Sequence, residues 1–268
     1  MSADSGTGQG AQMRLEERAS YPSLAGKRVF VTGGGSGIGA AIVEAFVRQG
    51  ARTAFVDVAA EASIALVDRL KRGCSADIWY RRCDVADVPL LQQAIADAAR
   101  ELGDFHVLVN NVASDERHAL LEVTPEYWDR RMAINQRPAF FAIQSVVPGM
   151  QRLGGGSIVN LGSAGWQTKA SGYPAYATAK SSVNGLTRGL ARELGARRIR
   201  INVVSPGWVM TERQLALMDA DSETDLMRSQ CLPDKLQPDD IAAMVLFLAS
   251  DQARAITAQE FLVDAGWH

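Results

Sequence analysis

The order of apolar segments along the chain constrains its fold more than any other feature. From residue 27 onward, short runs such as RVFVT, RTAFVDV, DIWYRRCDV and FHVLVNN alternate with longer stretches that are apolar along one side. Runs that are apolar at almost every position indicate strands buried on both faces, as in a parallel sheet covered by helices. The first half therefore predicts four strand and helix units in succession, the fourth helical stretch covering residues 125–150.

The second half continues the same alternation. SIVNLGS, RIRINVVSP and EFLVDAG are predicted strands, a helix is expected at about residues 176–194, and residues 211–234 are predicted to be irregular and polar. Right-handed crossovers between such strands give an α/β fold: a single doubly wound, Rossmann-like domain with a central parallel sheet of about seven strands and helices on both faces. No repeat or linker interrupts residues 21–268, so one domain is predicted there.

Composition excludes several classes of function. Residues 1–20 are rich in serine, glycine, glutamine and charge, which predicts a flexible tail. A formal charge of -2 and a pI near 6.0 provide no basic field for nucleic acid or an anionic membrane, so a small-molecule substrate is expected. The cysteines and histidines lack metal-ligand spacing, so no metal site is predicted, and a reduced, cytoplasmic setting fits. No apolar run reaches the roughly 20 residues of a membrane span.

A glycine-rich turn follows the first predicted strand. TGGGSGIG, residues 32–39, precedes a helical stretch whose N-terminal amides can meet a pyrophosphate. Asp57 ends the second strand, where a carboxylate can accept hydrogen bonds from the adenosine ribose. Its charge repels a 2′-phosphate and no arginine follows it, so NAD is predicted over NADP; the alternative is an ordinary strand-end carboxylate. The residues assigned to the cofactor are Gly33, Gly35, Ser36, Gly37, Ile38, Gly39 and Asp57.

Four residues of the second half form a candidate catalytic group: Asn135, Ser163, Tyr176 and Lys180. Tyr176 and Lys180 share a helix face, while Ser163 follows a strand at the carboxyl end of the sheet. A phenol is a poor base, and we expect the Lys180 ammonium to lower its pKa. Ser163 would hold the reacting oxygen, and Asn135 would anchor a water chain to Lys180. Taken singly, each residue also fits a structural role, as a surface lysine, capping serine, core tyrosine or helix-breaking asparagine.

These motifs together resemble the short-chain dehydrogenase/reductase family, from about residue 24 to the end of the chain. TGGGSGIG is similar to the family's TGxxxGIG turn, and NNVA at 110–113 to its NNAG strand end. PGWVMT at 206–211 is similar to its nicotinamide-side segment. The resemblance implies that the four residues above form the catalytic tetrad. Val112 and Ser114 depart from the family pattern, so a locally shifted loop is expected. The cofactor residues that the resemblance adds are Asp84, Val85, Asn111, Tyr176, Lys180, Pro206, Gly207, Val209 and Thr211.

Three further segments resemble the branch of this family that oxidises free aldoses such as xylose, arabinose, galactose or fucose. They are DERH at 115–118, GWVMTERQ ending at Gln214, and QCLP around Cys231. Loop side chains at strand ends suit a polyhydroxylated substrate, with Trp166 stacking on the sugar ring and residues 211–234 forming a lid. A solvated charge run and packing tryptophans are the alternatives. The predicted substrate residues are Asp115, His118, Ser163, Trp166, Tyr176 and Gln214.

The sequence therefore predicts an NAD-dependent dehydrogenase that transfers a hydride from C1 of a free aldose to NAD and gives a lactone. Tyr176 would remove the proton of the anomeric hydroxyl. Two alternatives stay open: an NAD(P)-dependent reductase of a 3-oxoacyl or other carbonyl substrate, and an NAD-sensing binding protein without activity. The resemblance also implies a homotetramer or homodimer, with contacts through residues 125–150 and 176–194 and a second contact through the apolar C-terminus.

Overall fold

A seven-stranded parallel sheet forms the centre of the molecule in the computed structural model, which describes residues 19–73 and 77–268. The strand order is β3-β2-β1-β4-β5-β6-β7. This confirms the predicted α/β, doubly wound architecture. The predicted tail, residues 1–20, lies outside the described residues except for its last two positions. Within the described chain, no helix is long and apolar enough to cross a membrane.

Each strand coincides with an apolar run of the sequence, and neighbouring strands run in parallel register. Thr32 pairs with Asn110, and Asn110 pairs with Asn160, so the carboxyl ends of the central strands lie level at one edge. The strands are β1 (Arg28–Thr32), β2 (Arg52–Asp57), β3 (Ile78–Arg82), β4 (Val107–Asn110), β5 (Gly156–Leu161), β6 (Ile199–Pro206) and β7 (Glu260–Val263).

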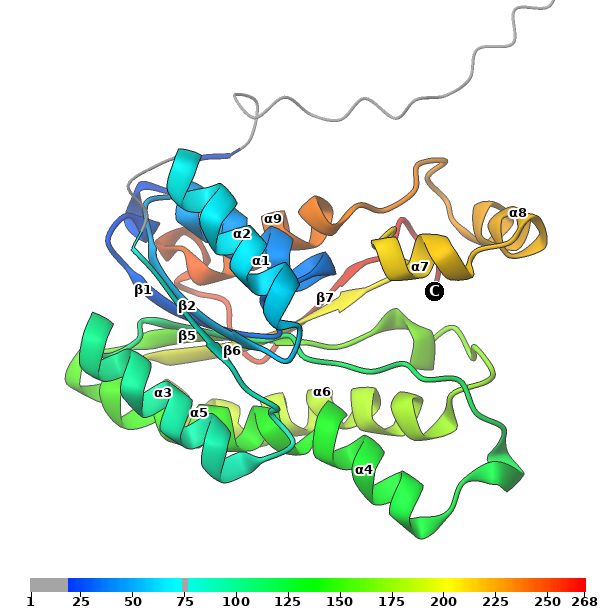
Figure 1. The fold of residues 1–268 in the computed structure, drawn as a ribbon, viewed down its shortest axis with the longest axis horizontal. Coiled ribbons are helices and arrows are strands. Elements are labelled where there is room, and N and C mark those ends of the chain that lie inside the picture. Colours follow the sequence, from blue (N-terminus) through cyan, green and yellow to red (C-terminus); the bar gives the residue numbers. More distant parts are fainter. Residues whose placement is uncertain (1–18, 74–76) are drawn as a thin grey trace, which may run out of the picture.

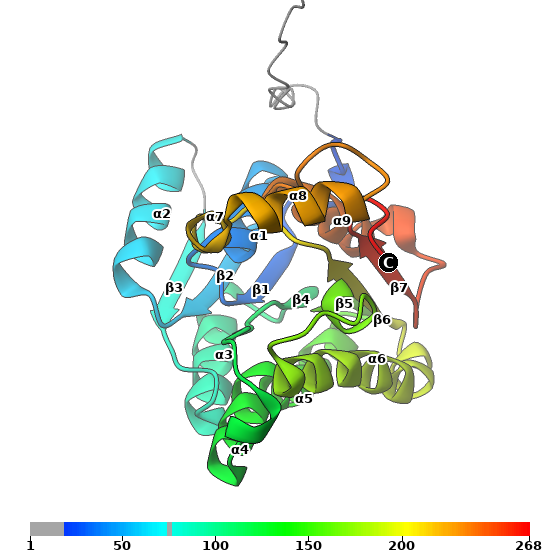
Figure 2. The ribbon, with the colours of Figure 1, turned by 90° about the vertical axis from the view of Figure 1, so that its right-hand side faces the viewer.

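Helices cover both faces of the sheet (Figures 1 and 2). One face carries α1 (Gly37–Arg48), α2 (Ala60–Gly73) and α9 (Pro238–Ala249). The other carries α3 (Val88–Leu102), α4 (Pro125–Asn135), α5 (Arg137–Arg152) and α6 (Pro174–Gly195). Short 3-10 turns complete the described connections: η2 (Pro22–Leu24), η3 (Leu120–Glu122), η4 (Ala164–Trp166) and η5 (Asp251–Ala253).

Side-chain alternation along the strands divides the interior into two cores. In β1, Val29 and Val31 point into the core beneath α1 and α9, while Phe30 points into the core beneath α3 and α5. Phe30 and Phe105 meet edge to face there, with ring centroids 5.2 Å apart. Because both faces of each central strand are buried, the strands need apolar residues at consecutive positions.

The segment 211–234 corrects the prediction of an irregular region. It contains two short helices, α7 (Glu212–Leu217) and α8 (Ala220–Ser229), which lie beyond the carboxyl edge of the sheet (Figure 1). Thr211 accepts a hydrogen bond from the backbone N–H of Gln214, and Asp219 accepts one from Ser222, so each helix has a capped N-terminus. The predicted lid is therefore a helical pair.

Candidate active site

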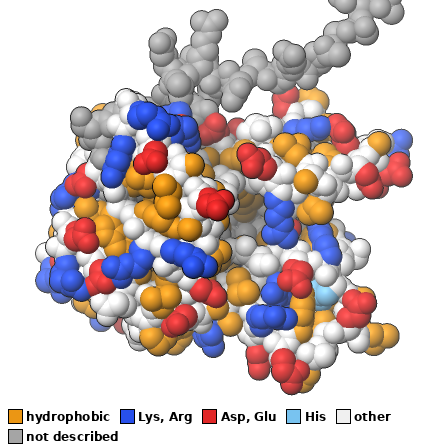
Figure 3. Space-filling model, viewed as in Figure 1, with side chains coloured by type: hydrophobic (Ala, Val, Ile, Leu, Met, Phe, Trp, Pro, Cys, Tyr) orange, Lys and Arg blue, Asp and Glu red, His pale blue; other side chains and the backbone are white. Residues whose placement is uncertain are grey.

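A cavity of about 1060 Å³ lies at the carboxyl edge of the sheet, where doubly wound folds bind ligands. The space-filling view shows the surface hollowed between the two layers, with charged side chains at the rim (Figure 3). Residues from the turn after β1, the loop after β4, the start of α6 and the segment 206–229 line it. The cavity therefore brings together residues from both halves of the chain.

The turn after β1 brings the chain close to the cavity, and three of its glycines, Gly33, Gly37 and Gly39, are among the lining residues. Gly33 has a φ of +70° and Gly37 a φ of +52°, a region that side chains disfavour. A Cβ on Gly39 would lie 1.8 Å from the carbonyl oxygen of Gly33, so α1 docks on the turn without space for a methyl group. The amide of Asn111 donates to the same oxygen at 2.8 Å. The turn thus fits a dinucleotide pyrophosphate, with backbone N–H groups of the helix N-terminus available to it.

Asp57 lies at the end of β2, is 9% exposed and lines the cavity. Its Oδ2 accepts the backbone N–H of Gly35 at 2.8 Å, and its Oδ1 accepts that of Ala59 at 2.9 Å. These two bonds fix the orientation of the carboxylate at the cavity wall. Gly35 does not itself line the cavity; its role is to hold Asp57. Arg82, opposite Asp57 in the sheet register, is outside the lining and donates to the carbonyl of Val58.

The remaining residues assigned to the cofactor lie along the same cavity wall. They come from the ends of β3, β4 and β6, and from the start of the lid. The loop after β4 is held to β1, because Thr32 Oγ1 accepts the backbone N–H of Asn111 at 3.0 Å. Those that line the cavity are Asp84, Val85, Asn111, Pro206, Gly207, Val209 and Thr211, and they join Gly33, Ser36, Gly37, Ile38 and Gly39 of the turn after β1.

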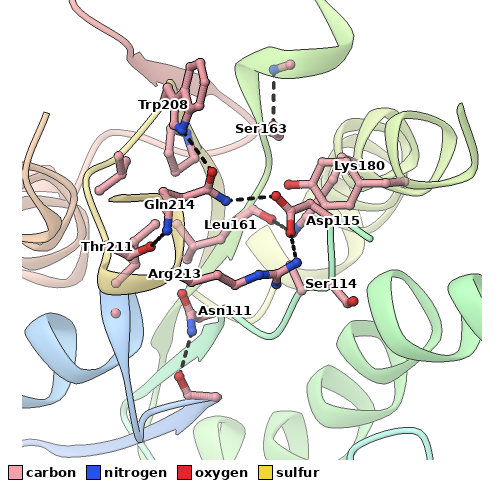
Figure 4. A pocket seen from close by; sticks show the side chains of 18 of the residues that line it. Asn111, Ser114, Asp115, Leu161, Ser163, Lys180, Trp208, Thr211, Arg213 and Gln214 are labelled. Carbon is pink, nitrogen blue, oxygen red and sulfur yellow. Dashed lines mark hydrogen bonds and ion pairs between the residues drawn. The ribbon is translucent and has the colours of Figure 1, made fainter. Parts of the chain in front are cut away.

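Ser163, Tyr176 and Lys180 converge on the cavity from β5 and α6. Tyr176 and Ser163 are joined by a side-chain hydrogen bond, and Ser163 Oγ also accepts the N–H of Gly165 at 3.1 Å. Lys180 lies one turn further along α6 and donates from Nζ to the carbonyl of Leu161 at 2.7 Å (Figure 4). Its Nζ is 6.0 Å from the centroid of the Tyr176 ring. Sequence spacing had predicted this shared face.

Burial determines the ionisation of both groups. It raises the pKa of Tyr176 to about 12, although the hydrogen bond from Ser163 opposes the rise. Burial lowers the pKa of Lys180 to about 8, since the ammonium has left water. The expected lowering of the phenol pKa by Lys180 is therefore not found here. The ammonium is directed at the carbonyl of Leu161, and desolvation of the phenolate dominates.

Asn135 is buried at the C-terminal end of α4 and does not line the cavity. Its Oδ1 accepts the N–H of Ser114 at 2.7 Å, and its Nδ2 donates to the carbonyl of Ser114 at 3.1 Å. A further bond from Nδ2 reaches the carbonyl of Arg131 at 3.0 Å. The side chain thus fixes the loop after β4, and a water chain from it to Lys180 stays a prediction.

His118 and Trp166 lie elsewhere than the sequence suggested, because neither lines the cavity. His118 is buried; its Nε2 accepts the backbone N–H of Ala175 at 3.1 Å, and its Nδ1 lies 2.9 Å from Tyr127 Oη. Accepting at Nε2 leaves the proton on Nδ1. His118 therefore ties the loop after β4 to the start of α6. The indole N–H of Trp166 is buried without a hydrogen-bond partner among the described residues, and the residue is only partly buried.

Asp115 and Gln214 do line the cavity, but they bind each other. Gln214 Nε2 donates to Asp115 Oδ2 at 2.9 Å, and the indole N–H of Trp208 donates to Gln214 Oε1 at 2.9 Å. Asp115 Oδ1 lies 2.7 Å from Arg213 Nη2. We call Asp115, Trp208, Arg213 and Gln214 the lid clasp (Figure 4). It holds α7 against the loop after β4.

Among the lining residues that were not assigned to the site from the sequence are Arg117, Tyr173 and Trp267. Arg117 stacks over the Tyr173 ring, with its guanidinium carbon 4.2 Å from the centroid. Tyr173 meets Tyr176 edge to face at 5.4 Å. The position of Tyr173 one turn before Tyr176 was a usable signal, whereas nothing in the sequence around Trp267 pointed to the cavity.

Comparison with known proteins assigns the family. A family model described as enoyl-(acyl carrier protein) reductase matches residues 33–268. D-xylose 1-dehydrogenase of Caulobacter vibrioides is 45% identical over 93% of this chain and 98% of its own length. A probable galactose dehydrogenase of Rhizobium meliloti is 46% identical over 92% and 96%.

A solved short-chain type dehydrogenase/reductase from Mycobacterium ulcerans superimposes with a TM-score of 0.87 at 28% identity, covering 93% of this chain and 91% of that one. Its sheet and helices therefore correspond to those described above over nearly the whole domain. Sequence identity, coverage and fold agree, and the chain belongs to the short-chain dehydrogenase/reductase family.

Proposed function

We propose that the protein is an NAD-dependent aldose 1-dehydrogenase, which oxidises C1 of a free cyclic sugar to a lactone. The hydrogen-bonded Ser163 and Tyr176 in a cavity that also contains Asp57 carry this proposal. The xylose and galactose dehydrogenases among its relatives favour a sugar as substrate. The polar and aromatic lining fits a polyhydroxylated molecule.

Tyr176 is the group that removes the proton in this mechanism. Its Oη takes the proton of the anomeric hydroxyl, and Ser163 Oγ donates a hydrogen bond to the same oxygen to hold it in place. The nicotinamide, when bound, supplies the acceptor for the hydride from C1. Lys180 has a pKa of about 8 and so exchanges protons near neutral pH, which supports removal of the proton from the site.

Asp57 supports the preference for NAD. Its carboxylate is fixed by two backbone N–H groups, so it cannot turn away from the nucleotide without losing both bonds. It accepts hydrogen bonds from ribose hydroxyls and repels a 2′-phosphate. Pro206, Gly207 and Thr211 lie at the other end of the cavity and would contact the nicotinamide side.

The experiment is the initial rate of NADH formation across pentoses, hexoses, 6-deoxyhexoses, polyols and secondary alcohols, with NADP in parallel. An aldose preference with a lactone as product is the expected result. Turnover confined to non-sugar alcohols, or reduction of 3-oxoacyl substrates in preference to aldose oxidation, would contradict the proposed substrate. Binding of NAD without any turnover would contradict the activity itself.

We also propose a cytoplasmic homotetramer. The two cysteines among the described residues, Cys83 and Cys231, are both free thiols, which fits a reducing setting. Trp128 on α4 and Phe140 on α5 are 39% and 44% exposed, and such side chains suit a contact between subunits. Helix α6 lies against α4, so assembly through these helices would support α6, which carries Tyr176 and Lys180.

Opening the lid clasp is expected to weaken substrate binding. In Asp115→Ala, Arg213 and Gln214 lose their shared partner, so α7 is held less firmly over the cavity. We expect the KM for aldose to rise about tenfold with little change in kcat, and trypsin to cleave after Arg213 faster. Steady-state kinetics and limited proteolysis measure these effects.

Lys235→Ala is the matched control, because it removes the Lys235–Glu223 ion pair of the same segment without touching the clasp. That variant should retain the wild-type KM. Equal KM and equal cleavage rates in Asp115→Ala and the wild type would show that the clasp does not hold the lid.

A further inference from the structure

Two of the five tryptophans of the chain, Trp208 and Trp267, line the cavity. The indole N–H of Trp208 is already bonded to Gln214, which fixes that ring in the lid clasp. Trp267 is not part of the lid clasp. It belongs to the turn after β7, residues 264–268, which we call the β7 turn.

Three polar contacts hold the β7 turn in place. Asp264 Oδ1 accepts the N–H of Gly266 at 2.9 Å, and Asp264 Oδ2 lies 2.8 Å from Nδ1 of His268. The carbonyl of Ala265 accepts the N–H of Cys231 at 2.9 Å, which anchors the turn to the end of the lid. Trp267 therefore has a fixed backbone on both sides.

Close packing fixes the same turn further. Gly266 has a φ of +75°, and a Cβ there would lie 2.9 Å from Cβ of Cys231. A Cβ on Gly207 would lie 2.8 Å from Cα of Asp264. The turn thus packs directly on the segment that carries Trp208, with no side chain between them. An aromatic ring held this way loses little conformational entropy when a ligand packs against it.

The sheet places Trp267 at the substrate end of the cavity. β7 is the edge strand beside β6, whereas Asp57 and Asp84 follow β2 and β3 near the opposite edge. The catalytic Ser163 follows β5, on the same side of β1 as β7. A ring on the β7 turn therefore faces the region next to the reacting atoms and away from the adenosine.

We propose that Trp267 is a specificity-determining residue that packs against the apolar face of the cyclic aldose. A pyranose ring presents adjacent C–H bonds on one face, and an indole offers a flat apolar surface to match them. This inference rests on the proposed function and specifies its substrate class: cyclic sugars with a continuous C–H face. Small acyclic alcohols lack that face and gain nothing from the ring.

Kinetics of Trp267→Ala test the assignment. We expect the KM for the best cyclic aldose to rise about tenfold, equivalent to about 1.4 kcal/mol, with kcat nearly retained, because the contact is made equally in ground and transition states. Trp267→Phe should recover most of the loss. The kcat/KM for a small secondary alcohol should stay unchanged, and Trp79→Phe, on β3 and outside the cavity lining, should retain the wild-type KM.

Fluorescence tests the contact without turnover. In Tyr176→Phe saturated with NAD, addition of the aldose should change the tryptophan emission. The change should persist in Tyr176→Phe/Trp79→Phe and be largely lost in Tyr176→Phe/Trp267→Phe, because the other lining indole, Trp208, is already fixed by its bond to Gln214. This readout separates contact with the sugar from a general effect on folding.

The outcomes are distinguishable. The inference about Trp267 is wrong, while the proposed function stands, if the wild type oxidises aldoses and Trp267→Ala keeps the wild-type KM. The same conclusion holds if kcat/KM of Trp267→Ala falls equally for acyclic alcohols and for aldoses. An emission change caused by NAD alone and not by the sugar would likewise assign Trp267 to the cofactor and overturn it. If the wild type oxidises no aldose, the proposed function fails first.

Discussion

Tyr176→Phe will oxidise aldoses about a thousandfold more slowly than the wild type. The substitution removes one oxygen from a ring that is otherwise retained, so α6 and the cavity remain intact. Proton transfer by a positioned side chain contributes typically 10²- to 10⁴-fold to a rate, and Tyr176 is the hydroxyl bonded to Ser163 at the proposed reacting position. NAD binding, measured by calorimetry, should be retained.

The pH dependence of the wild type supplies the control. Burial raises the pKa of the phenol to about 12, so it is protonated at neutral pH and must lose its proton before it accepts one from the sugar. Oxidation measured as kcat/KM should therefore rise with pH between about pH 6 and pH 9, and the rise should be absent from the residual activity of Tyr176→Phe. A variant that kept wild-type turnover would rule Tyr176 out as the base.

Asp57→Ala will reduce the preference for NAD over NADP by about a thousandfold. The variant loses hydrogen bonds to the ribose, which lowers kcat/KM with NAD by about 100-fold. It also removes a charge whose repulsion of a 2′-phosphate is worth about 1.4 kcal/mol, or about tenfold in kcat/KM with NADP, at about 6 Å and an effective dielectric of about 40. Arg82, opposite in the register, is then the nearest cation on the neighbouring strand.

Asp57→Asn separates the two effects. It keeps the shape of the side chain and one acceptor oxygen for Gly35 or Ala59, so the turn after β1 stays in place while the charge is lost. Turnover with NADP should improve in both variants, and turnover with NAD should fall less in Asp57→Asn. If neither variant improves with NADP, the carboxylate does not select the cofactor.

The fold was predictable because a strand that is buried on both faces can be recognised in the sequence by consecutive apolar residues. Val29, Phe30 and Val31 pack into alternate cores, and none of them faces water. The convergence of Tyr176 and Lys180 was equally accessible, since a spacing of four on a helix fixes a common face. These features depend on local geometry alone.

The two helices of the predicted lid were not predicted, because they bury very little. Leu226 is the buried residue of α8, and α7 buries none, so no apolar period marks either helix. The usable signal was capping: Thr211 and Asp219 each precede acidic residues in a first turn. Composition suggested a polar loop, whereas the caps indicated helices.

The substrate residues were only partly predictable because loop side chains find their partners far along the chain. His118 bonds to the backbone of Ala175, 57 residues away, and Gln214 bonds to Asp115, 99 residues away. A polar residue at a strand end can bind a ligand or another loop, and only the folded chain decides which. Trp267 reaches the cavity through the position of β7, which no local pattern encodes.

The reversal of strand order between β1 and β4 has an evolutionary consequence. Asp57 and Asp84 lie on one side of this seam, while Ser163 and the β7 turn lie on the other. In the proposed binding mode, mutations at Asp57 and Asp84 would change the choice of nucleotide on segments that do not touch the sugar, and mutations in the β7 turn would change the sugar and spare the adenosine end. A protein lineage with this sheet can therefore change its cofactor preference and its substrate preference independently.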